Sequence, residues 1–281
     1  MVGCGPGLAS ANRSRWCRMR DCHDPLSLST VALMQSPRTG MVAGPLLPGA
    51  GPAWDPHWSH CSWMATMPLN LTPDELLTTT RTVRKRLDFE RPVERELIEE
   101  CIEIAIQAPT GGLKQNWHWV VVGDPDLKRR IRDVYRDSWL GSMNREHLDV
   151  YAADDGRASR LDRVLDGGTY LAENLDRAPW LVIICGTGRV RGAATVPEQS
   201  RFWASVIPAM WSFMLAARAR GLGVAWTTEH LKREAEVADL LGIPYPEVTQ
   251  CGLLPVAYSI GTDFKPAARI KGTQLTHWNG W

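Results

Sequence analysis

LIEECIEIAIQAPTGGLKQNWHWVVV, residues 97–122, shows three kinds of pattern in succession. Its first half places apolar side chains at helical spacing between glutamates, which predicts an amphipathic helix ended by Pro109. A turn over 110–112 follows, and the bulky, β-branched run Trp117–Val122 predicts a buried strand. The stripe of the helix consists of Leu97, Ile98, Cys101, Ile102, Ala105 and Ala108. A helix followed at once by a buried strand indicates a layered fold.

The alternation of helices and strands continues in both directions. Thr72-Pro73-Asp74-Glu75 is typical of a capping box and predicts a helix to about residue 79. The cap Asp124-Pro125-Asp126 predicts a helix to about residue 135, and residues 138–166 are polar enough to form an excursion or lid. The remaining predictions are helices over 170–175, 200–220 (ended by Gly221 and Gly223) and 229–241 (ended by Gly242 and Pro244), with strands over 181–185, 224–227 and 248–259. This order predicts an α/β or α+β sandwich.

Residues 1–66 differ in character, because they are rich in Gly, Pro, Ser and Arg and show no period. We expect this stretch to be disordered and residues 67–281 to form one domain. It lacks the continuous apolar core of a secretory signal. A transit peptide and a true start at Met64 or Met67 are the two alternatives. Cys17, Cys22 and His23 lack a fourth ligand, so we expect no metal site.

The overall composition excludes some classes of partner. Lys and Arg number 32 against 31 Asp and Glu, so we expect neither nucleic acid nor a membrane surface as a partner. No apolar run approaches the roughly 20 residues that span a bilayer. The seven cysteines include no CxxC pair, which suits reduced thiols in a cytoplasmic protein.

Common catalytic motifs are missing from the sequence. It contains no nucleophile elbow, HExxH, phosphate loop or dinucleotide fingerprint. Gly221-Leu222-Gly223 follows a predicted helix and precedes a predicted strand, the reverse of the order that binds a dinucleotide phosphate. We therefore interpret these glycines as the end of a helix.

Three segments carry possible binding chemistry. They are the basic patch RTVRKR (81–86), the turn APTGGLKQNW (108–117) and the late cations Lys265, Arg269 and Lys271. Each alone has an ordinary explanation as a solvated face, a helix-to-strand turn or a soluble end. In this order, and with GLGVAWTT (221–228), they resemble the FMN-dependent nitroreductases over about residues 72–281. The resemblance implies an α+β fold: an α/β/α sandwich with a mostly antiparallel sheet, a domain-swapped C-terminal extension and a homodimer.

The resemblance also implies a set of FMN ligands. Arg81, joined by Arg269 and Lys271, would meet the phosphate, a dianion that favours charge-assisted contacts. Thr82 would lie beside the pyrimidine edge. Arg84 would face flavin N1 and O2, where negative charge settles on reduction, and so would raise the reduction potential.

The other implied ligands surround the ring system. The turn at Pro109, Thr110 and Gly111 resembles the one that reaches the flavin of a partner subunit. The matched strand end, which would lie over the isoalloxazine and offer an amide to N5, is Trp226, Thr227 and Thr228. In this family NADPH or NADH reduces the flavin, which then reduces nitroaromatics, quinones or related small acceptors in a ping-pong cycle. No catalytic acid, base or nucleophile is required.

The sequence departs from the family at several positions. Leu113 occupies a place where Asn is usual, and Thr80 falls where many members have another Arg. The sequence therefore departs from the family at two positions that would contact the ribityl chain and the phosphate. Met210 and Trp211 replace a polar pair, which favours a hydrophobic or aromatic substrate.

Two alternatives keep the flavin. The same fold resembles reductive dehalogenases of iodotyrosine and enzymes that fragment flavin to make a cobalamin base. Residues 138–166 are long enough for the lid such enzymes need, but they lack the Glu-Tyr-Lys grouping expected for zwitterion capture. The second alternative is a non-catalytic FMN-binding protein, which would be yellow and would not bleach with NADPH.

Overall fold

The computed structural model describes residues 69–142, 160–190 and 195–281. The chain divides into two units, Met1–Trp58 and Ser59–Trp281, and all the described residues belong to the second. The predicted disordered stretch 1–66, with Cys17, Cys22 and His23, lies outside the described residues. The three cysteines within them, Cys101, Cys185 and Cys251, are free and buried.

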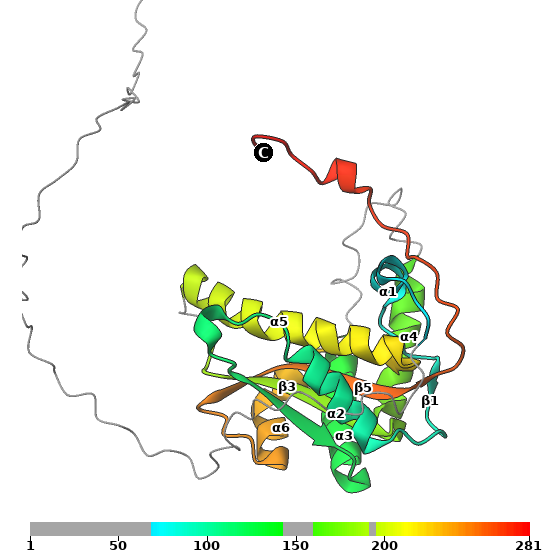
Figure 1. Ribbon diagram of the computed structural model, residues 1–281. Helices are drawn as coiled ribbons and strands as arrows, with labels where there is room; N and C mark the ends of the chain where they lie inside the picture. Colours follow the sequence, from blue (N-terminus) through cyan, green and yellow to red (C-terminus); the bar gives the residue numbers. More distant parts are fainter. Residues whose placement is uncertain (1–68, 143–159, 191–194) are drawn as a thin grey trace, which may run out of the picture. The chain divides into compact units, whose positions relative to one another are not determined.

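The described unit is built around one antiparallel sheet (Figure 1). Its order is β1-β5-β3-β2, and β4 also pairs with β5. The central position falls to the longest strands because they are apolar along almost their whole length and can be covered on both faces. The strands are β1 (Leu87–Asp88), β2 (Trp117–Val122), β3 (Trp180–Thr187), β4 (Leu222–Val224) and β5 (Val248–Ser259).

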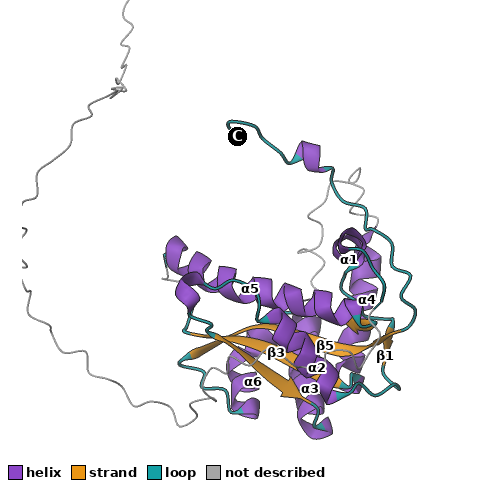
Figure 2. Cartoon of the chain, in the orientation of Figure 1, coloured by secondary structure: helices purple, strands orange, loops and turns teal. Residues whose placement is uncertain are grey.

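Helices cover both faces of the sheet (Figure 2). One face carries α2 (Arg95–Ala105) and α5 (Val196–Ala219), which share a core with the sheet around Met210 and Phe213. The other carries α3 (Pro125–Ser142), α4 (Leu161–Asn174) and α6 (Glu234–Leu241). The short α1 (Pro73–Thr79) contacts α5. The α+β sandwich with a mostly antiparallel sheet is therefore confirmed.

Local signals placed several elements correctly. The Thr72 capping box is present at the start of α1, and β2 and β5 have the predicted bounds. Gly221 follows the end of α5 and has a φ of +77°, a backbone conformation that favours glycine. The interpretation of Gly221-Leu222-Gly223 as a helix end is therefore confirmed for Gly221. Gly223 lies within β4 instead, where a Cβ would come within 3.1 Å of Val83.

The predicted excursion over 138–166 is wrong at both ends. Helix α3 continues to Ser142 and α4 begins at Leu161; residues 143–159 lie outside the described part. The reason is a contact between the two helices. The indole of Trp139 in α3 packs against Gly168 in α4 so closely that a Cβ atom on Gly168 would lie 2.3 Å from the indole ring. The indole Nε1 of Trp139 also donates a hydrogen bond to Thr169 Oγ1 at 3.1 Å. Pairing of a large with a small residue across helices leaves no local signal.

Two further boundaries differ. The short strand predicted over 224–227 is present but lies earlier, as β4 over Leu222–Val224. Thr227 keeps an isolated bridge to Leu253. The predicted helix over 229–241 is an α-helix only from Glu234, because 3₁₀ turns occupy Glu229–Arg233 (η6). Strand β1 was not predicted.

The last residues, 261–281, form what we call the C-terminal arm (red in Figure 1). Apart from the 3₁₀ turn η7 (Gly272–Gln274) it has no regular structure, and Trp278 and Trp281 are 85% and 104% exposed. The predicted domain swap of this arm stays a prediction. Among the described helices, none combines the length and apolar character needed to cross a bilayer.

Candidate functional site

Three arginines gather around one aromatic ring at the base of the C-terminal arm. The guanidinium carbons of Arg81, Arg86 and Arg218 lie 6.0, 4.4 and 4.9 Å from the ring centroid of Phe264. Arg81 also donates to the carbonyl of Lys265. We call these three side chains the arginine cluster. It places the predicted phosphate ligand Arg81 beside Arg86 of the same basic patch and beside Arg218, which the sequence did not single out.

Arg218 is the buried member of this cluster, with 4% of its surface exposed. Its Nη2 donates to the carbonyl of Thr262 at 2.8 Å, but its Nε and Nη1 have no hydrogen-bond partner among the described residues. Burial, and then repulsion from Arg81 and Arg86, lower the pKa of the Arg218 guanidinium. A buried cation facing two others creates a strongly positive environment.

Arg84 lies apart from the cluster, on the α3 and α4 side of the sheet. It is half-buried, and a Cβ on Gly167 of α4 would lie 3.4 Å from its Cδ. Burial lowers the pKa of the guanidinium, and the nearby Tyr135 is the opposing influence. Arg84 forms no ion pair within the part of the chain that the structure describes. Such a cation is poised to receive negative charge from a ligand.

A buried tyrosine connects Arg84 with the predicted flavin-facing strand end. The hydroxyl of Tyr135 lies 2.8 Å from Thr227 Oγ1, and burial raises the pKa of Tyr135. The Thr227 backbone N–H donates to Leu253 O at 3.1 Å. That amide is therefore occupied, so an amide for flavin N5 would come from Trp226 or Thr228.

The indole of Trp226 lies on the α5 side of the sheet, close to Gly252 and to Met210 of α5. A Cβ atom added to Gly252 would lie 3.5 Å from the indole Nε1 of Trp226 and 2.7 Å from Met210 Sδ. Thr82 forms a parallel bridge with Val224. The strand pairing thus brings the 81–86 patch next to the segment that leads into 226–228.

The predicted turn at Pro109, Thr110 and Gly111 lies far from these residues in the same chain. Its Gly111 N–H donates to Ser205 Oγ at 3.3 Å, in the first half of α5. Ser205 and Arg218 are separated by about 20 Å of helix. Leu113 beside the turn is 83% exposed. The turn and the arginine cluster therefore lie at separate places along α5 in one chain.

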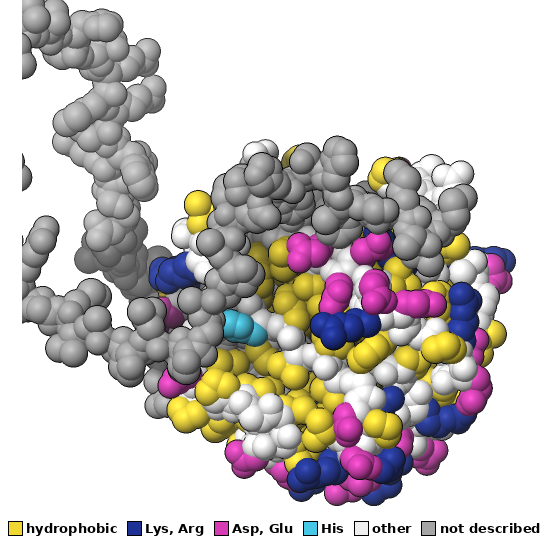
Figure 3. Space-filling view, turned by 60° about the horizontal axis from the view of Figure 1, so that its bottom comes forward, with side chains coloured by type: hydrophobic (Ala, Val, Ile, Leu, Met, Phe, Trp, Pro, Cys, Tyr) yellow, Lys and Arg dark blue, Asp and Glu magenta, His cyan; other side chains and the backbone are white. Residues whose placement is uncertain are grey.

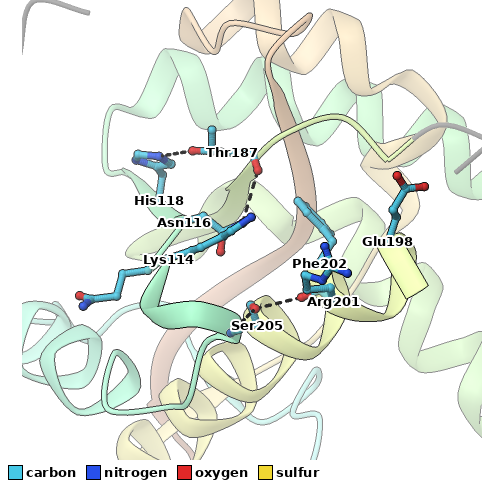
Figure 4. A pocket seen from close by; sticks show the side chains of 10 residues that line it. Lys114, Asn116, His118, Thr187, Glu198, Arg201, Phe202 and Ser205 are labelled. Atoms are coloured by element: carbon cyan, nitrogen blue, oxygen red, sulfur yellow. Dashed lines mark hydrogen bonds between the residues drawn. The ribbon is translucent and has the colours of Figure 1, made fainter. Parts of the chain in front are cut away.

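A cavity of about 540 Å³ lies beside this turn (Figure 4). His118 Nε2 lies 2.9 Å from Thr187 Oγ1, and Ser205 Oγ donates to the carbonyl of Arg201 at 3.0 Å. Of the predicted ligands only Gly111 lines this cavity. The side chains labelled in Figure 4 are Lys114, Asn116, His118, Thr187, Glu198, Arg201, Phe202 and Ser205.

The two late cations show no contact with Arg81. Arg269 Nη1 donates to the carbonyl of Ala268 at 3.3 Å, and Arg160 donates to the same carbonyl at 3.3 Å. Lys271 is exposed. The structure places the base of the arm against Arg81, while the phosphate role of Arg269 and Lys271 stays a prediction.

Both signs of charge are present on one face of the unit. In Figure 3, acidic and basic side chains share the same region of that face, with hydrophobic side chains between them. This agrees with the near balance of 32 basic and 31 acidic residues.

His230, two positions after Thr228, predicts an acid-sensitive fold. It is fully buried, neither ring nitrogen has a hydrogen-bond partner among the described residues, and burial lowers its pKa to about 3. Between pH of about 6.5 and about 3 the unfolded chain binds a proton there and the folded chain does not. The free energy of unfolding should therefore fall by about 1.4 kcal/mol per pH unit as the pH is lowered.

Urea unfolding at pH 7, 6 and 5 would measure this loss. The variant His230→Phe removes the titrating group, so its stability should decline less steeply over the same range. Parallel declines for the two proteins would contradict the assignment.

Comparison with known proteins identifies the class. The sequence profile of the Nitroreductase family matches residues 77–258, so the chain belongs to that family. The match includes the 81–86 patch, the turn and 226–228, and ends before the C-terminal arm.

Among curated relatives, iodotyrosine deiodinase 1 of Rattus norvegicus is 30% identical over 186 residues, covering 66% of this chain and 61% of the relative. The 5,6-dimethylbenzimidazole synthase of Rhodospirillum rubrum is 31% identical over 140 residues, covering 49% and 60%. The chain thus spans about three-fifths of the length of these relatives.

Solved structures show the same fold. An oxidized iodotyrosine deiodinase bound to FMN and 3-iodo-L-tyrosine superposes with a TM-score of 0.53 at 24% identity, covering 70% of this chain and 94% of that one. The FMN- and NADPH-dependent nitroreductase NfnB from Sphigopyxis sp. strain HMH gives a TM-score of 0.54 at 23% identity, covering 75% and 100%. The predicted nitroreductase-like fold is confirmed.

Proposed function

We propose that this chain is an FMN-dependent oxidoreductase. The observation that carries the proposal is Arg84, a half-buried cation without an ion-pair partner in the described residues, next to the Tyr135–Thr227 hydrogen bond. The arginine cluster fits the other end of the cofactor, because a phosphate dianion would balance its excess positive charge. Arg81 would hold the phosphate end, and Thr82 and Arg84 would lie at the pyrimidine edge.

The chain's own residues would bind FMN and adjust its reduction potential, and none of them would take part in the reaction as an acid, base or nucleophile. Bound FMN supplies two-electron transfer at its ring system. The guanidinium of Arg84 would stabilise negative charge at N1 and O2, and Tyr135 would hold the Thr227 hydroxyl in place. Met210, expected from the sequence to lie beside the substrate, is fully buried in the core, so it cannot contact a substrate. The half-buried indole of Trp226 is the apolar surface on the α5 side, and an aromatic substrate suits it.

For the reaction, we rank reductive removal of a halide from an aromatic ring above nitro or quinone reduction. The support is the similarity of about 30% to iodotyrosine deiodinases. In this reaction two electrons and a proton replace the carbon–halogen bond by a carbon–hydrogen bond, and the halide leaves. NADPH or NADH would supply the electrons. Nitroaromatics and quinones are the second class of acceptor, supported by the likeness to the NfnB fold.

A single anaerobic experiment separates these readings. The protein should purify yellow and bleach when NADPH or NADH is added. The bleached protein is then mixed with 3-iodo-L-tyrosine, a nitroaromatic or a quinone, and the return of colour and the release of iodide are followed. A colourless protein that does not take up added FMN would end the proposal, and a yellow protein that neither donor bleaches would favour a storage role.

We also propose that two copies of the chain form the site. Helix α5 carries Trp203, Ile207 and Trp211 at intervals of four residues. The two indoles are half-buried at the edge of the core, and Ile207 between them is 41% exposed. A helix that is hydrophobic all round is normally covered. A partner on this face would also bring its own Gly111 turn toward the flavin, whereas the same chain's turn lies away from the arginine cluster.

Light scattering should therefore give twice the chain mass of 31.3 kDa. The variant Ile207→Asp places a charge in that interface and is expected to give a monomer that retains less FMN. The control Val164→Asp alters another exposed apolar residue, at 48% exposure on α4, and should stay dimeric. A wild-type monomer, or an Ile207→Asp dimer, would contradict the proposed interface.

A further inference from the structure

Arg218 raises a question that the proposed FMN site does not answer. It is 4% exposed, and two of its guanidinium nitrogens have no hydrogen bond among the described residues. It also shares the ring of Phe264 with two other arginines, Arg81 and Arg86. Among the described residues, the acid paired within the arginine cluster is Asp263, which binds Arg86 at 2.6 Å. Three positive charges therefore share one negative charge.

An ordinary structural arginine at the end of α5 looks different. Arg220, two positions further on, is less buried, with 12% of its side chain exposed, and forms an ion pair with Glu100 at 2.8 Å. If the task of Arg218 were only to support the helix end, an acidic partner of this kind would remove the cost of burying its charge. Its absence in the described part indicates that the charge itself is used.

Arg218 also holds the parts of the cluster in place. Its Nη2 donates to the carbonyl of Thr262 at 2.8 Å and contacts Thr79 Oγ1 at 3.4 Å, so it joins the end of α1 to the base of the C-terminal arm. Phe264 and Lys265, which contact Arg81, follow two and three residues after Thr262. Moving Arg218 would therefore move the surroundings of Arg81.

We propose that Arg218 is a positioning residue for the phosphate of FMN: it orients Arg81 through the arm and adds a buried positive charge beneath the subsite. This rests on the proposed function. A charge in a poorly solvated place acts over longer distances than one in water, so Arg218 strengthens phosphate binding without touching the anion. Riboflavin, which has the same ring system and no phosphate, should gain nothing from it.

The test compares the dissociation constants of FMN and riboflavin for the full-length protein stripped of flavin. Arg218→Met removes the charge and the hydrogen bonds, and Arg218→Gln removes the charge but keeps a donor for Thr262. Both should reduce the preference for FMN over riboflavin by at least about ten-fold. Arg218→Lys keeps the charge and should retain most of the preference. The matched control Arg220→Met should lower the melting temperature but leave the preference unchanged.

The outcomes separate the two levels of inference. Wild-type protein that binds neither flavin overturns the proposed function. Wild-type protein that prefers FMN, with variants at Arg218 that lose FMN and riboflavin affinity equally, overturns only the role of Arg218. If Arg218→Met does not fold, the contrast between Arg218→Gln and Arg218→Lys decides, because these two differ in charge: equal preferences for FMN would contradict the proposal.

Discussion

In the variant Arg84→Ala, FMN that remains bound is expected to have a reduction potential lower by about 30–60 mV. The estimate takes a hydrogen bond to a charged group as worth about 1.5–3 kcal/mol, and about 30 mV corresponds to 1.4 kcal/mol for two electrons. The effect should be this large because Arg84 is half-buried and has no ion-pair partner among the described residues that would compete for its charge. FMN retention during purification should also decrease.

The potential is measured by anaerobic titration against a reference dye. Lys85→Ala is the matched control, because Lys85 is the next residue, is exposed and already pairs with Asp166 at 2.5 Å. It should shift the potential by less than about 10 mV, as expected for a screened surface charge. An unchanged potential in Arg84→Ala with FMN bound would remove the role assigned to Arg84.

The variant Glu234→Ala is expected to lose about 1.5–3 kcal/mol of folding stability, the range for hydrogen bonds to a charged group. Arg189 binds both carboxylate oxygens of Glu234, at 2.7 and 2.8 Å, and the two side chains are 15% and 14% exposed. The carboxylate also accepts the backbone N–H of Gln250 in β5 at 2.9 Å. Its removal leaves a cation and an amide unsatisfied at the junction of α6 with the sheet.

Urea unfolding of Glu234→Ala and of the double variant Arg189→Leu/Glu234→Ala would test this. The double variant should recover part of the loss, because no unpaired charge remains buried. The control Glu99→Ala breaks an exposed ion pair with Arg95, in which the Arg95 side chain is 76% exposed and the Glu99 side chain 54% exposed. It should lower the free energy of unfolding by less than about 0.5 kcal/mol. A loss below 1 kcal/mol in Glu234→Ala would contradict the assignment.

The site was only partly predictable. Arg81, Thr82 and Arg84 follow from a compact motif, and the strand pairing places them next to the segment that leads into Trp226–Thr228. Arg218 had no such signal, because an arginine near the end of a long helix is common and only its neighbours make it unusual. Tyr135 was predicted merely as the end of a helix, and its hydrogen bond to Thr227 spans 92 positions.

Short-range patterns determined on their own where α1, α2, β2 and β5 lie, and they indicated the family, because capping boxes, apolar periods and compact motifs act within a few residues. Only the tertiary structure decided that Arg81, Arg86 and Arg218 share one ring and that α3 and α4 pack together through Trp139 and Gly168. It also decided that the Gly111 turn contacts the first half of α5, whereas the cluster lies at the end of that helix. The physical reason is that strand pairing and helix packing set such distances, and both join residues far apart along the chain.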